Sequence, residues 1–272
     1  SFEYPPETGF GGIGTYTWHH ARGLARLGHE VHVLAGATRP TALRSQAAEG
    51  VAVHRFQADG PLMKTFDGFG RLRFWWTRQR LQNAWSMRLG LAALMREHRF
   101  DVAEMPECGA EGALLATRRD LPGVVRLHSP SQLIMPYYDV RPGDIRLCSA
   151  IERRGMLRAG ALSACSQFVR DETARALGLA RQVPVITNGL DIAWFDASGA
   201  AFDVHQRYGL PRNKPIVLFT GRMEPRKGIG LLEELAAALL ERHDVSLVLA
   251  GDDLFGHLRE SIVPALERRR LQ

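Results

Sequence analysis

Short apolar runs recur along the 272-residue chain, and between most of them apolar residues return every three or four positions. The short runs predict strands at 31–35, 51–56, 101–105, 123–128, 161–166, 183–187, 215–220 and 245–250. The stretches between them predict helices at 13–27, 74–98, 109–119, 167–177 and 228–242. Strands that alternate with helices favour right-handed crossovers, so we expect an α/β protein with a doubly wound parallel sheet.

The segment 188–213 interrupts this alternation, because it is rich in turn-forming residues and lacks an apolar period. We expect it to connect an N-terminal domain at 1–200 to a second unit at 201–272. Only two strands are predicted in the second unit, and two strands rarely form a stable sheet alone. We therefore expect this unit to pack on the first domain, or the natural chain to continue beyond Gln272.

Composition is that of a globular protein, with 45% hydrophobic and 24% charged residues. No apolar run approaches the roughly 18 residues of a membrane span. The three cysteines, Cys108, Cys148 and Cys165, are too widely spaced to indicate a disulfide framework or a zinc site, which favours a cytoplasmic protein. The opening "SFEYPPETG" lacks the pattern of a signal peptide, and because it begins with serine we expect residues upstream to be missing.

The stretch "GFGGIGTY" contains a literal G-x-G-x-x-G at Gly9, Gly11 and Gly14. A dinucleotide fingerprint also needs a strand directly before it and an acidic residue at the tip of the next strand. Two prolines precede this loop, and Glu30 comes before the next strand, so the NAD interpretation fails on two counts. Gly11 and Gly12 still lead into a helix N-terminus that favours anions, although a flexible loop explains them equally well.

A second loop, "TGRMEPRKG", lies between a predicted strand and the helix that follows it. Arg222 and Lys227 provide a guanidinium and an ammonium, which suit a diphosphate. Most loop cations are simply solvated. The place of these two, at the carboxyl end of a parallel strand, favours ligand binding because open α/β sheets bind ligands there.

These motifs occur with others in a recognisable order. They are "GGIGTYTWHHARGLARLGHEVHVLAG", "DVAEMPECGAEG", "VVRLHSPSQ", "ALSACSQFVRDETARALGL", "VITNGLDIAWF" and "GRMEPRKG". Together they resemble the retaining glycosyltransferases of family 4, which have two facing Rossmann-like domains, the GT-B architecture. The resemblance implies transfer of a hexose-type sugar from a nucleotide-diphosphate donor to an acceptor with retention of configuration.

The resemblance also implies roles for individual residues. The expected catalytic residues are His128, which faces the transferred sugar, and Arg222 and Lys227, which hold the donor diphosphate. Donor binding is expected to include Gly11, Gly12, Gly221 and Asn188 as well, with Gly189 beside Asn188 at the mouth of the cleft. Glu104 and Glu107 are expected to reach the acceptor. A lone histidine more often caps a backbone group, but the strand end opposite the glycine loop favours the functional role for His128.

The chain departs from the family's pattern in its second domain. Glu233 and Glu241 match the E-x₇-E motif literally, but they follow the cationic loop directly and fit the solvated face of a helix. The true motif is expected beyond Gln272, so we expect a chain truncated at its C-terminus, a partial donor domain, and a fragment that lacks activity for that reason. The resemblance implies no metal ion or other cofactor, and the pair Asp252 and Asp253 is more typical of helix capping.

The segment 68–96 has six arginines, no acidic residue and several aromatic residues. It is either a basic aromatic helix that touches anionic lipid or a lipid-linked acceptor, or a core helix. We favour the core, with the stripe Phe74, Leu81, Trp85, Leu89, Ala92 and Met95; Phe69 and the other aromatics are left for an acceptor cleft. Peripheral contact with the inner membrane surface is a further expectation.

Other classes of function remain as alternatives. One is an NAD-dependent oxidoreductase, and another is a non-catalytic module that binds anions or nucleic acid through the net charge of +6. An arginine-rich globular surface explains that charge without such a partner. Because no recognition helix and no aromatic RNP-type strand is found, we expect a nucleotide-diphosphate sugar as partner and no nucleic acid. The acceptor is left open among a sugar, a lipid-linked group and a small molecule.

Overall fold

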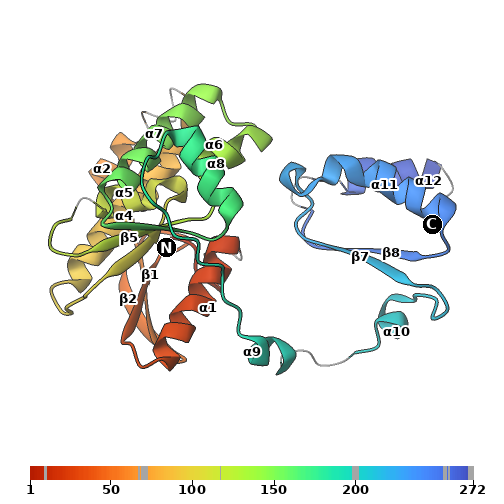
Figure 1. Cartoon of the computed structure of the whole chain (residues 1–272), viewed down its shortest axis with the longest axis horizontal. Helices are drawn as coiled ribbons and strands as arrows, with labels where there is room; N and C mark the ends of the chain where they lie inside the picture. Colours follow the sequence, from red (N-terminus) through yellow and green to blue (C-terminus); the bar gives the residue numbers. More distant parts are fainter. Residues whose placement is uncertain are drawn as a thin grey trace. The chain divides into compact units, whose positions relative to one another are not determined.

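The computed structural model describes residues 1–8, 11–66, 68, 73–116, 118–197, 202–253, 256 and 258–268. They form two compact units, an N-terminal unit at Ser1–Ile192 and a C-terminal unit at Ala193–Gln272 (Figure 1). The division falls within the segment 188–213 that was predicted to connect two domains. The boundary expected between residues 200 and 201 lies outside the described residues, as do Gly9 and Phe69.

The N-terminal unit contains two three-stranded sheets. The first has the order β1-β3-β2, with β1 (Val31–Ala35), β2 (Thr41–Ala48) and β3 (Val51–Gln57). The second has the order β4-β5-β6 and is parallel throughout, with β4 (Ala103–Pro106), β5 (Gly123–Leu127) and β6 (Ala161–Ala164). The α/β class and the parallel pairing are confirmed.

Two strand predictions need correction. β2 was not predicted; it pairs antiparallel with β3 at the edge of the sheet, and its mostly exposed, polar sequence carries no apolar signal. The strand predicted at 183–187 is a single bridge between Ala164 and Val185. β4 begins at Ala103 and ends at Pro106, slightly later than its predicted range.

The helices of the N-terminal unit are α1 (Gly12–Arg26), α2 (Pro61–Thr65), α4 (Trp75–Leu94), η1 (Cys108–Ala110), α5 (Glu111–Leu115), α6 (Ser131–Ile134), η2 (Met135–Tyr137), α7 (Pro142–Arg158) and α8 (Gln167–Leu177). Those predicted at 13–27, 74–98 and 167–177 are observed as α1, α4 and α8, and the one predicted at 109–119 is observed as the shorter α5; the other helical elements of this unit were not predicted. The 17-residue helix α7 was missed. Its buried face includes Asp144, Ser149 and Glu152, which interrupt the apolar period that sequence patterns detect.

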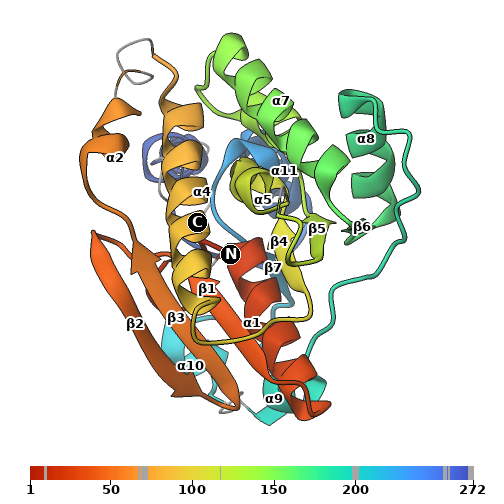
Figure 2. The same ribbon diagram turned by 90° about the vertical axis from the view of Figure 1, so that its left-hand side faces the viewer.

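Helices cover both faces of the first sheet (Figure 2). Ala21 of α1 packs with alternate residues of β1 and β3, such as Val33 and Val53. On the other face, a Cβ placed at Gly90 of α4 would meet Leu34 at 3.0 Å and Phe56 at 3.3 Å. Successive side chains of β1 and β3 point to opposite faces of the sheet, so alternate residues pack against α1 and against α4.

The predicted apolar stripe of α4 is wrong. Leu89 is 39% exposed, whereas the buried face is formed by Trp76, Thr77, Asn83, Ala84, Ser86, Met87, Gly90, Leu91 and Leu94. Small and polar residues are buried because α4 lies close to its neighbours and because its first turn is bonded to α7. The Asp144 carboxylate accepts hydrogen bonds from the backbone N–H groups of Trp76 and Thr77, both at 2.9 Å.

The C-terminal unit has two parallel strands, β7 (Ile216–Thr220) and β8 (Ser246–Ala250), in its described part. Its helices are α9 (Ile192–Ala197), α10 (Val204–Tyr208), η3 (Pro225–Lys227), α11 (Ile229–Arg242), η4 (Leu258–Ile262) and α12 (Val263–Arg268). Its core is built around Met223, Ile229, Leu232 and Ile262. Leu218 of β7 is 57% exposed, so this small sheet is covered incompletely.

The contact between α7 and α5 generates a stability prediction. A Cβ at Gly155 of α7 would lie 2.8 Å from the Ala113 Cα, a backbone atom that has little freedom to move. We expect Gly155→Ala to destabilise the N-terminal unit by about 1–3 kcal/mol. Urea unfolding followed by tryptophan fluorescence measures this, since Trp18, Trp75, Trp76 and Trp85 lie in that unit.

Gly23→Ala in α1 is the matched control, because a Cβ there meets nothing within 4 Å. It should stabilise the helix by roughly 0.5–1 kcal/mol, since alanine has a higher helix propensity than glycine. Equal effects of the two substitutions would contradict close packing at Gly155.

Candidate functional site

The first group of predicted residues lies at the carboxyl ends of β4 and β5. Glu107 follows β4, and His128 follows β5. The Glu107 Oε1 accepts hydrogen bonds from the backbone N–H groups of His128 at 2.8 Å and Ser129 at 2.6 Å. Parallel strands end at one edge of a sheet, which explains why residues so far apart in the chain meet here.

Glu107 is only 2% exposed, so its role in the structure is to hold the turn that carries His128. Its expected contact with an acceptor remains a prediction. Glu104 lies on β4 and is more accessible, with a side chain that is 31% exposed. Its Oε1 accepts a 2.8 Å hydrogen bond from the Tyr16 hydroxyl, and its Oε2 is 3.9 Å from the His20 Nε2.

Tyr16 of α1 links several of these residues and was not singled out from the sequence. Its ring lies edge-on to His128, with a 5.0 Å centroid separation, and the Arg126 guanidinium carbon lies 4.3 Å from the centroid of the Tyr16 ring. Burial, followed by the charge of Glu104, raises the pKa of Tyr16 well above its usual range, so the hydroxyl stays protonated and donates to Glu104. This role was not predicted because Tyr16 lies among the apolar residues of the helix predicted at 13–27.

Arg126 is the second residue that sequence reasoning missed. It lies within β5, is 2% exposed, and donates to the Asn188 Oδ1 at 2.9 Å and to the Ile186 carbonyl at 2.6 Å. The predicted residue Asn188 is thereby joined to the same group as His128. A lone arginine inside the apolar strand "VVRL" was the available signal, because a buried charge needs specific partners.

The environment of His128 keeps its ring neutral near pH 7. Burial, followed by the positive charge of Arg126, lowers the pKa of His128 to about 4. A neutral imidazole has one ring nitrogen that donates and one that accepts a hydrogen bond. His128 therefore suits hydrogen bonding to a polar ligand better than charge pairing with an anion.

Gly11 and Gly12 form the start of α1, as predicted. Gly11 is the N-cap residue with an extended backbone, and no side chain in the described part of the chain caps this helix. A Cβ at Gly12 would meet nothing within 4 Å, whereas one at Gly11 would collide with the Glu3 carboxylate. The first turn itself contains no acidic residue, and the Glu3 carboxylate lies beside Gly11 at the end of the helix that favours anions.

Beneath this group lies a pair of buried carboxyl groups, Glu107 and Glu152. The Glu152 Oε1 accepts hydrogen bonds from the Gly109 N–H at 2.8 Å and the Ser131 hydroxyl at 2.7 Å. Burial, followed by the charge of Glu152, raises the pKa of Glu107 to about 8. Burial also raises the pKa of Glu152 to about 7, against the opposing effect of its hydrogen bonds from Ser131 and Gly109. The pair therefore holds protons near pH 7.

The second group of predicted residues lies in the C-terminal unit, on the loop between β7 and α11. Gly221 has a φ of 143°, and Arg222 is exposed. A Cβ at Gly251 would lie 1.9 Å from the Gly221 carbonyl oxygen, so glycine at 251 lets this loop start directly at the end of β7. Lys227 ends the 3₁₀ turn η3 and is exposed.

Glu224 organises this loop and was not predicted. It is 2% exposed, and its Oε1 lies 2.8 Å from the Arg226 Nη2 and 3.6 Å from the Arg222 Nη2. The loop therefore presents two arginines beside one buried carboxylate, and the exposed Lys227 follows them in the chain. Asp253 accepts a 3.2 Å hydrogen bond from the Arg259 N–H, in keeping with the capping role expected for the acidic pair.

The predicted site residues thus fall into two groups, one within each unit. His128, Glu104, Glu107 and Asn188 belong to one network in the N-terminal unit, and Tyr16 connects it to the helix that begins at Gly12. Gly221, Arg222 and Lys227 share a loop of the C-terminal unit.

A comparison with family models identifies the chain. Residues 10–194 match the model of Glycosyltransferase Family 4, which is more than half of the chain. The chain belongs to Glycosyltransferase Family 4. Membership favours a glycosyltransferase over the NAD-dependent oxidoreductase that was kept as an alternative. Within the part of this family 4 chain that the structure describes, no helix combines the length and the apolar character needed to cross a membrane.

Curated relatives agree with this membership. The chain is 32% identical over 166 residues to an alpha-maltose-1-phosphate synthase of Mycolicibacterium smegmatis, an alignment that covers 59% of this chain and 42% of the relative. It is 28% identical to the enzyme of that name from Mycobacterium tuberculosis, over 92% of this chain and 58% of the relative. The family 4 chain therefore spans about half the length of these relatives.

Solved structures show the same fold. Sucrose-phosphate synthase from Thermosynechococcus elongatus matches with a TM-score of 0.67 at 19% identity, over 96% of this chain and 63% of that one. The catalytic domain of starch synthase IV from Arabidopsis thaliana, bound to ADP and acarbose, matches with a TM-score of 0.68 at 14% identity, over 99% and 71%. The predicted GT-B fold with Rossmann-like domains is confirmed by these likenesses.

The buried carboxyl pair predicts a pH dependence of stability. In the folded chain the pKa of Glu107 is raised to about 8 from its usual 4.5, so the folded state keeps a proton that the unfolded state loses. The free energy of unfolding should therefore fall as the pH rises from 4.5 towards 8. Glu107→Gln stays neutral and keeps an oxygen acceptor for both N–H groups, so it should reduce this fall by on the order of 2 kcal/mol.

Urea unfolding at about pH 5 and pH 8, followed by tryptophan fluorescence, tests the effect. Glu234→Gln on the exposed side of α11 is the control and should leave the pH dependence unchanged. A Glu107→Gln variant that loses as much stability as the parent between these pH values would show that Glu107 is ionised in the folded chain.

Proposed function

We propose that this chain is part of a retaining glycosyltransferase that moves a hexose-type sugar from a nucleotide-diphosphate donor to an acceptor. The observation that carries the proposal is the match to Glycosyltransferase Family 4 over residues 10–194, a range that contains the network around His128. The activities for which the relatives are named support sugar transfer. They include maltose-1-phosphate synthases and a phosphatidyl-myo-inositol mannosyltransferase of Mycolicibacterium smegmatis, 28% identical over 95% of this chain.

The proposed donor site includes the cationic loop of the C-terminal unit. Arg222 and Lys227, with Arg226 beside them, would hold the diphosphate and stabilise the charge that develops on it as the sugar leaves. In the N-terminal unit, the start of α1 at Gly12 is proposed as a further place that favours negative charge. A nucleotide-diphosphate donor is supported by a solved structure with a TM-score of 0.61, Anabaena HepE in complex with UDP and glucose.

His128 is proposed to bind the transferred sugar. Its ring is neutral near pH 7 because its pKa is lowered to about 4, so it can donate a hydrogen bond to one sugar hydroxyl group and accept one from another. Asn188 is fixed by Arg126 and shapes the same edge. Glu104, oriented by the Tyr16 hydroxyl, is the proposed acceptor-side carboxylate.

We propose that the transfer step uses no metal ion, because fixed cations and helix N–H groups provide the positive charge that the leaving diphosphate needs. The acceptor remains open among a sugar, a small molecule and a lipid-linked group. We also propose that the protein acts in the cytoplasm.

Calorimetry with UDP, GDP, ADP, their sugar nucleotides and NAD, in the presence of EDTA, tests the donor site. We expect one nucleoside diphosphate to bind with EDTA present. Arg222→Ala combined with Lys227→Ala should weaken it about 100-fold, since two charge-assisted hydrogen bonds each contribute about 1.5 kcal/mol.

Arg242→Ala is the control, because Arg242 is an exposed cation at the far end of α11, and it should bind like the parent. Binding of NAD alone would overturn the proposal. Diphosphate binding that survives the double substitution would move the donor site away from this loop, and no binding of any diphosphate would contradict a donor site in this chain.

A further inference from the structure

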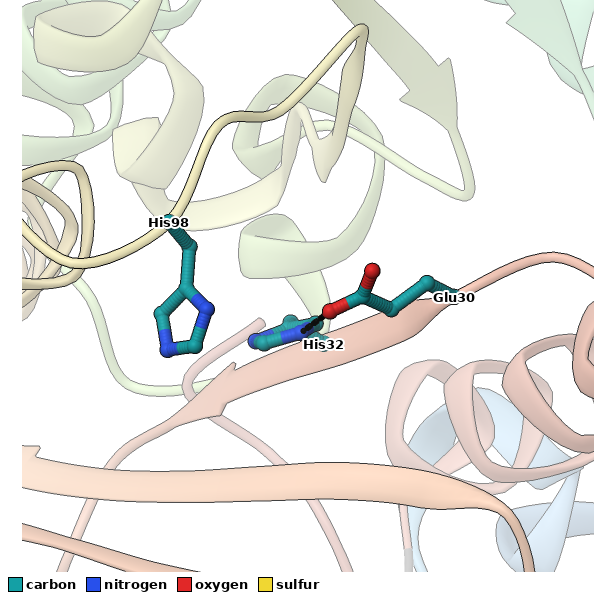
Figure 3. A group of neighbouring side chains, drawn as sticks. All are labelled: Glu30, His32 and His98. Carbon is teal, nitrogen blue, oxygen red and sulfur yellow. Dashed lines mark hydrogen bonds and ion pairs between the residues drawn. The ribbon is translucent and has the colours of Figure 1, made fainter.

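Three side chains with metal-ligand chemistry meet at the amino-terminal end of β1, apart from the proposed donor site. They are Glu30, His32 and His98 (Figure 3), and their ligand atoms all lie within 4.8 Å of one another. Glu30 directly precedes β1, His32 lies on β1, and His98 lies beyond the end of α4. The proposed transfer reaction uses none of these side chains.

The fold brings these residues together through the register of the first sheet. β1 pairs in parallel with β3, with His32 opposite Ala52 and Leu34 opposite His54. His32 and His54 are on the face that α4 covers, because they share the alternation of Leu34 and Phe56. The His98 N–H donates to the Leu94 carbonyl at 2.9 Å, and the turn after α4 places the His98 ring 4.5 Å from the His32 ring.

The donor set selects the class of ion. Two imidazoles and one carboxylate suit zinc and related divalent transition ions, whereas calcium and magnesium prefer oxygen ligands alone. Zinc bonds of about 2.0–2.1 Å place tetrahedral ligands roughly 3.4 Å apart. The His32 Nε2 and the Glu30 Oε1 are 3.0 Å apart, and because the third ligand atom lies within 4.8 Å, the His98 ring must move inward to complete the site.

A hydrogen-bonded relay behind His32 supports its role as a ligand. The His32 Nδ1 lies 2.9 Å from the His54 Nε2, and the His54 Nδ1 lies 2.6 Å from the Ser45 Oγ. Metal-binding histidines usually donate their other ring N–H to such a partner, which fixes the tautomer and the ring orientation.

A simple ion pair explains less of this arrangement. It accounts for Glu30 and His32, whose atoms are 3.0 Å apart, but not for the third imidazole or for the relay to Ser45. The Glu30 side chain is 85% exposed while the His32 side chain is 9% exposed, so an ion could enter from solvent and meet a buried, oriented ligand.

We propose that Glu30, His32 and His98 bind one zinc-type divalent ion, with water as the fourth ligand. His32 binds through Nε2, and its single proton then lies on Nδ1 and is donated to the His54 Nε2. The His54 Nδ1–H in turn donates to the Ser45 hydroxyl oxygen. The ion joins the start of β1 to the turn after α4, and its effect is to stabilise the N-terminal unit rather than to take part in sugar transfer.

Zinc binding to the untagged chain, freed of metal with EDTA and then dialysed, tests this site. Calorimetry should show one zinc per chain, and X-ray absorption should show nitrogen and oxygen ligands at about 2.0–2.1 Å. Zinc should also raise the unfolding temperature, because it binds only the folded site. Magnesium and calcium should do neither.

Glu30→Gln and His98→Ala should each weaken zinc binding at least about ten-fold, and Ser45→Ala about ten-fold through the relay. Glu97→Gln, an exposed carboxylate next to His98, and His243→Ala, an exposed histidine of the C-terminal unit, should bind like the parent. Glu30 is so exposed that its substitution leaves the fold intact, which circular dichroism in EDTA checks. Absence of zinc binding by the parent, sulfur ligands in the absorption spectrum, or unchanged binding by Glu30→Gln and His98→Ala would each overturn the proposal.

Discussion

The burial of the Glu107 carboxyl group is the constraint on which the site in the N-terminal unit depends. It joins the end of β4 to the turn after β5, because the same oxygen accepts from the N–H groups of His128 and Ser129. Glu152 makes the corresponding link from α7 to Gly109 and Ser131. Buried acidic groups are costly unless they are hydrogen-bonded or protonated, and this pair is both.

A third buried carboxylate joins two helices in the same way, by accepting hydrogen bonds from backbone N–H groups. Asp144, on α7, accepts from the N–H groups of Trp76 and Thr77 in the first turn of α4 and also from the Thr77 hydroxyl. A helix N-terminus has unpaired N–H groups, and here an acidic side chain from another helix takes the place of a local cap. Helix α7 therefore supplies two acidic side chains, one that fixes the start of α4 and one that fixes the loops beside His128.

The buried acidic side chains of α7 also explain which elements could be predicted from the sequence and which could not. Strands such as β1, β3, β5 and β7 are short, mainly apolar segments, so their positions followed directly from the pattern. Helix α7 was missed because its inner face contains Asp144 and Glu152, whose burial makes sense only once their partners are known. The stripe on α4 was misplaced for the same reason, since Thr77 is buried against Asp144 while Leu89 is exposed.

Within the candidate site, residues that stand at strand ends were predictable and residues that connect them were not. His128, Glu104 and Asn188 occupy recognisable places along the chain. Tyr16 and Arg126 acquire their roles only through contacts between α1, β5 and the segment after β6. The pattern of apolar residues predicts the helix or strand on which each functional side chain lies. The register of the parallel strands decides which of these side chains meet.

Glu224 gives the cationic loop a further property. Its carboxylate lies between Arg222 and Arg226 and is almost completely buried, so it occupies a position that resembles that of an anionic group of a ligand. The guanidinium groups are therefore already oriented and partly neutralised before any ligand arrives. An incoming phosphate would exchange with Glu224 as the partner of Arg222 instead of ordering a free side chain. At the proposed donor site, such an internal competitor would lower the affinity for a phosphate group and speed its release.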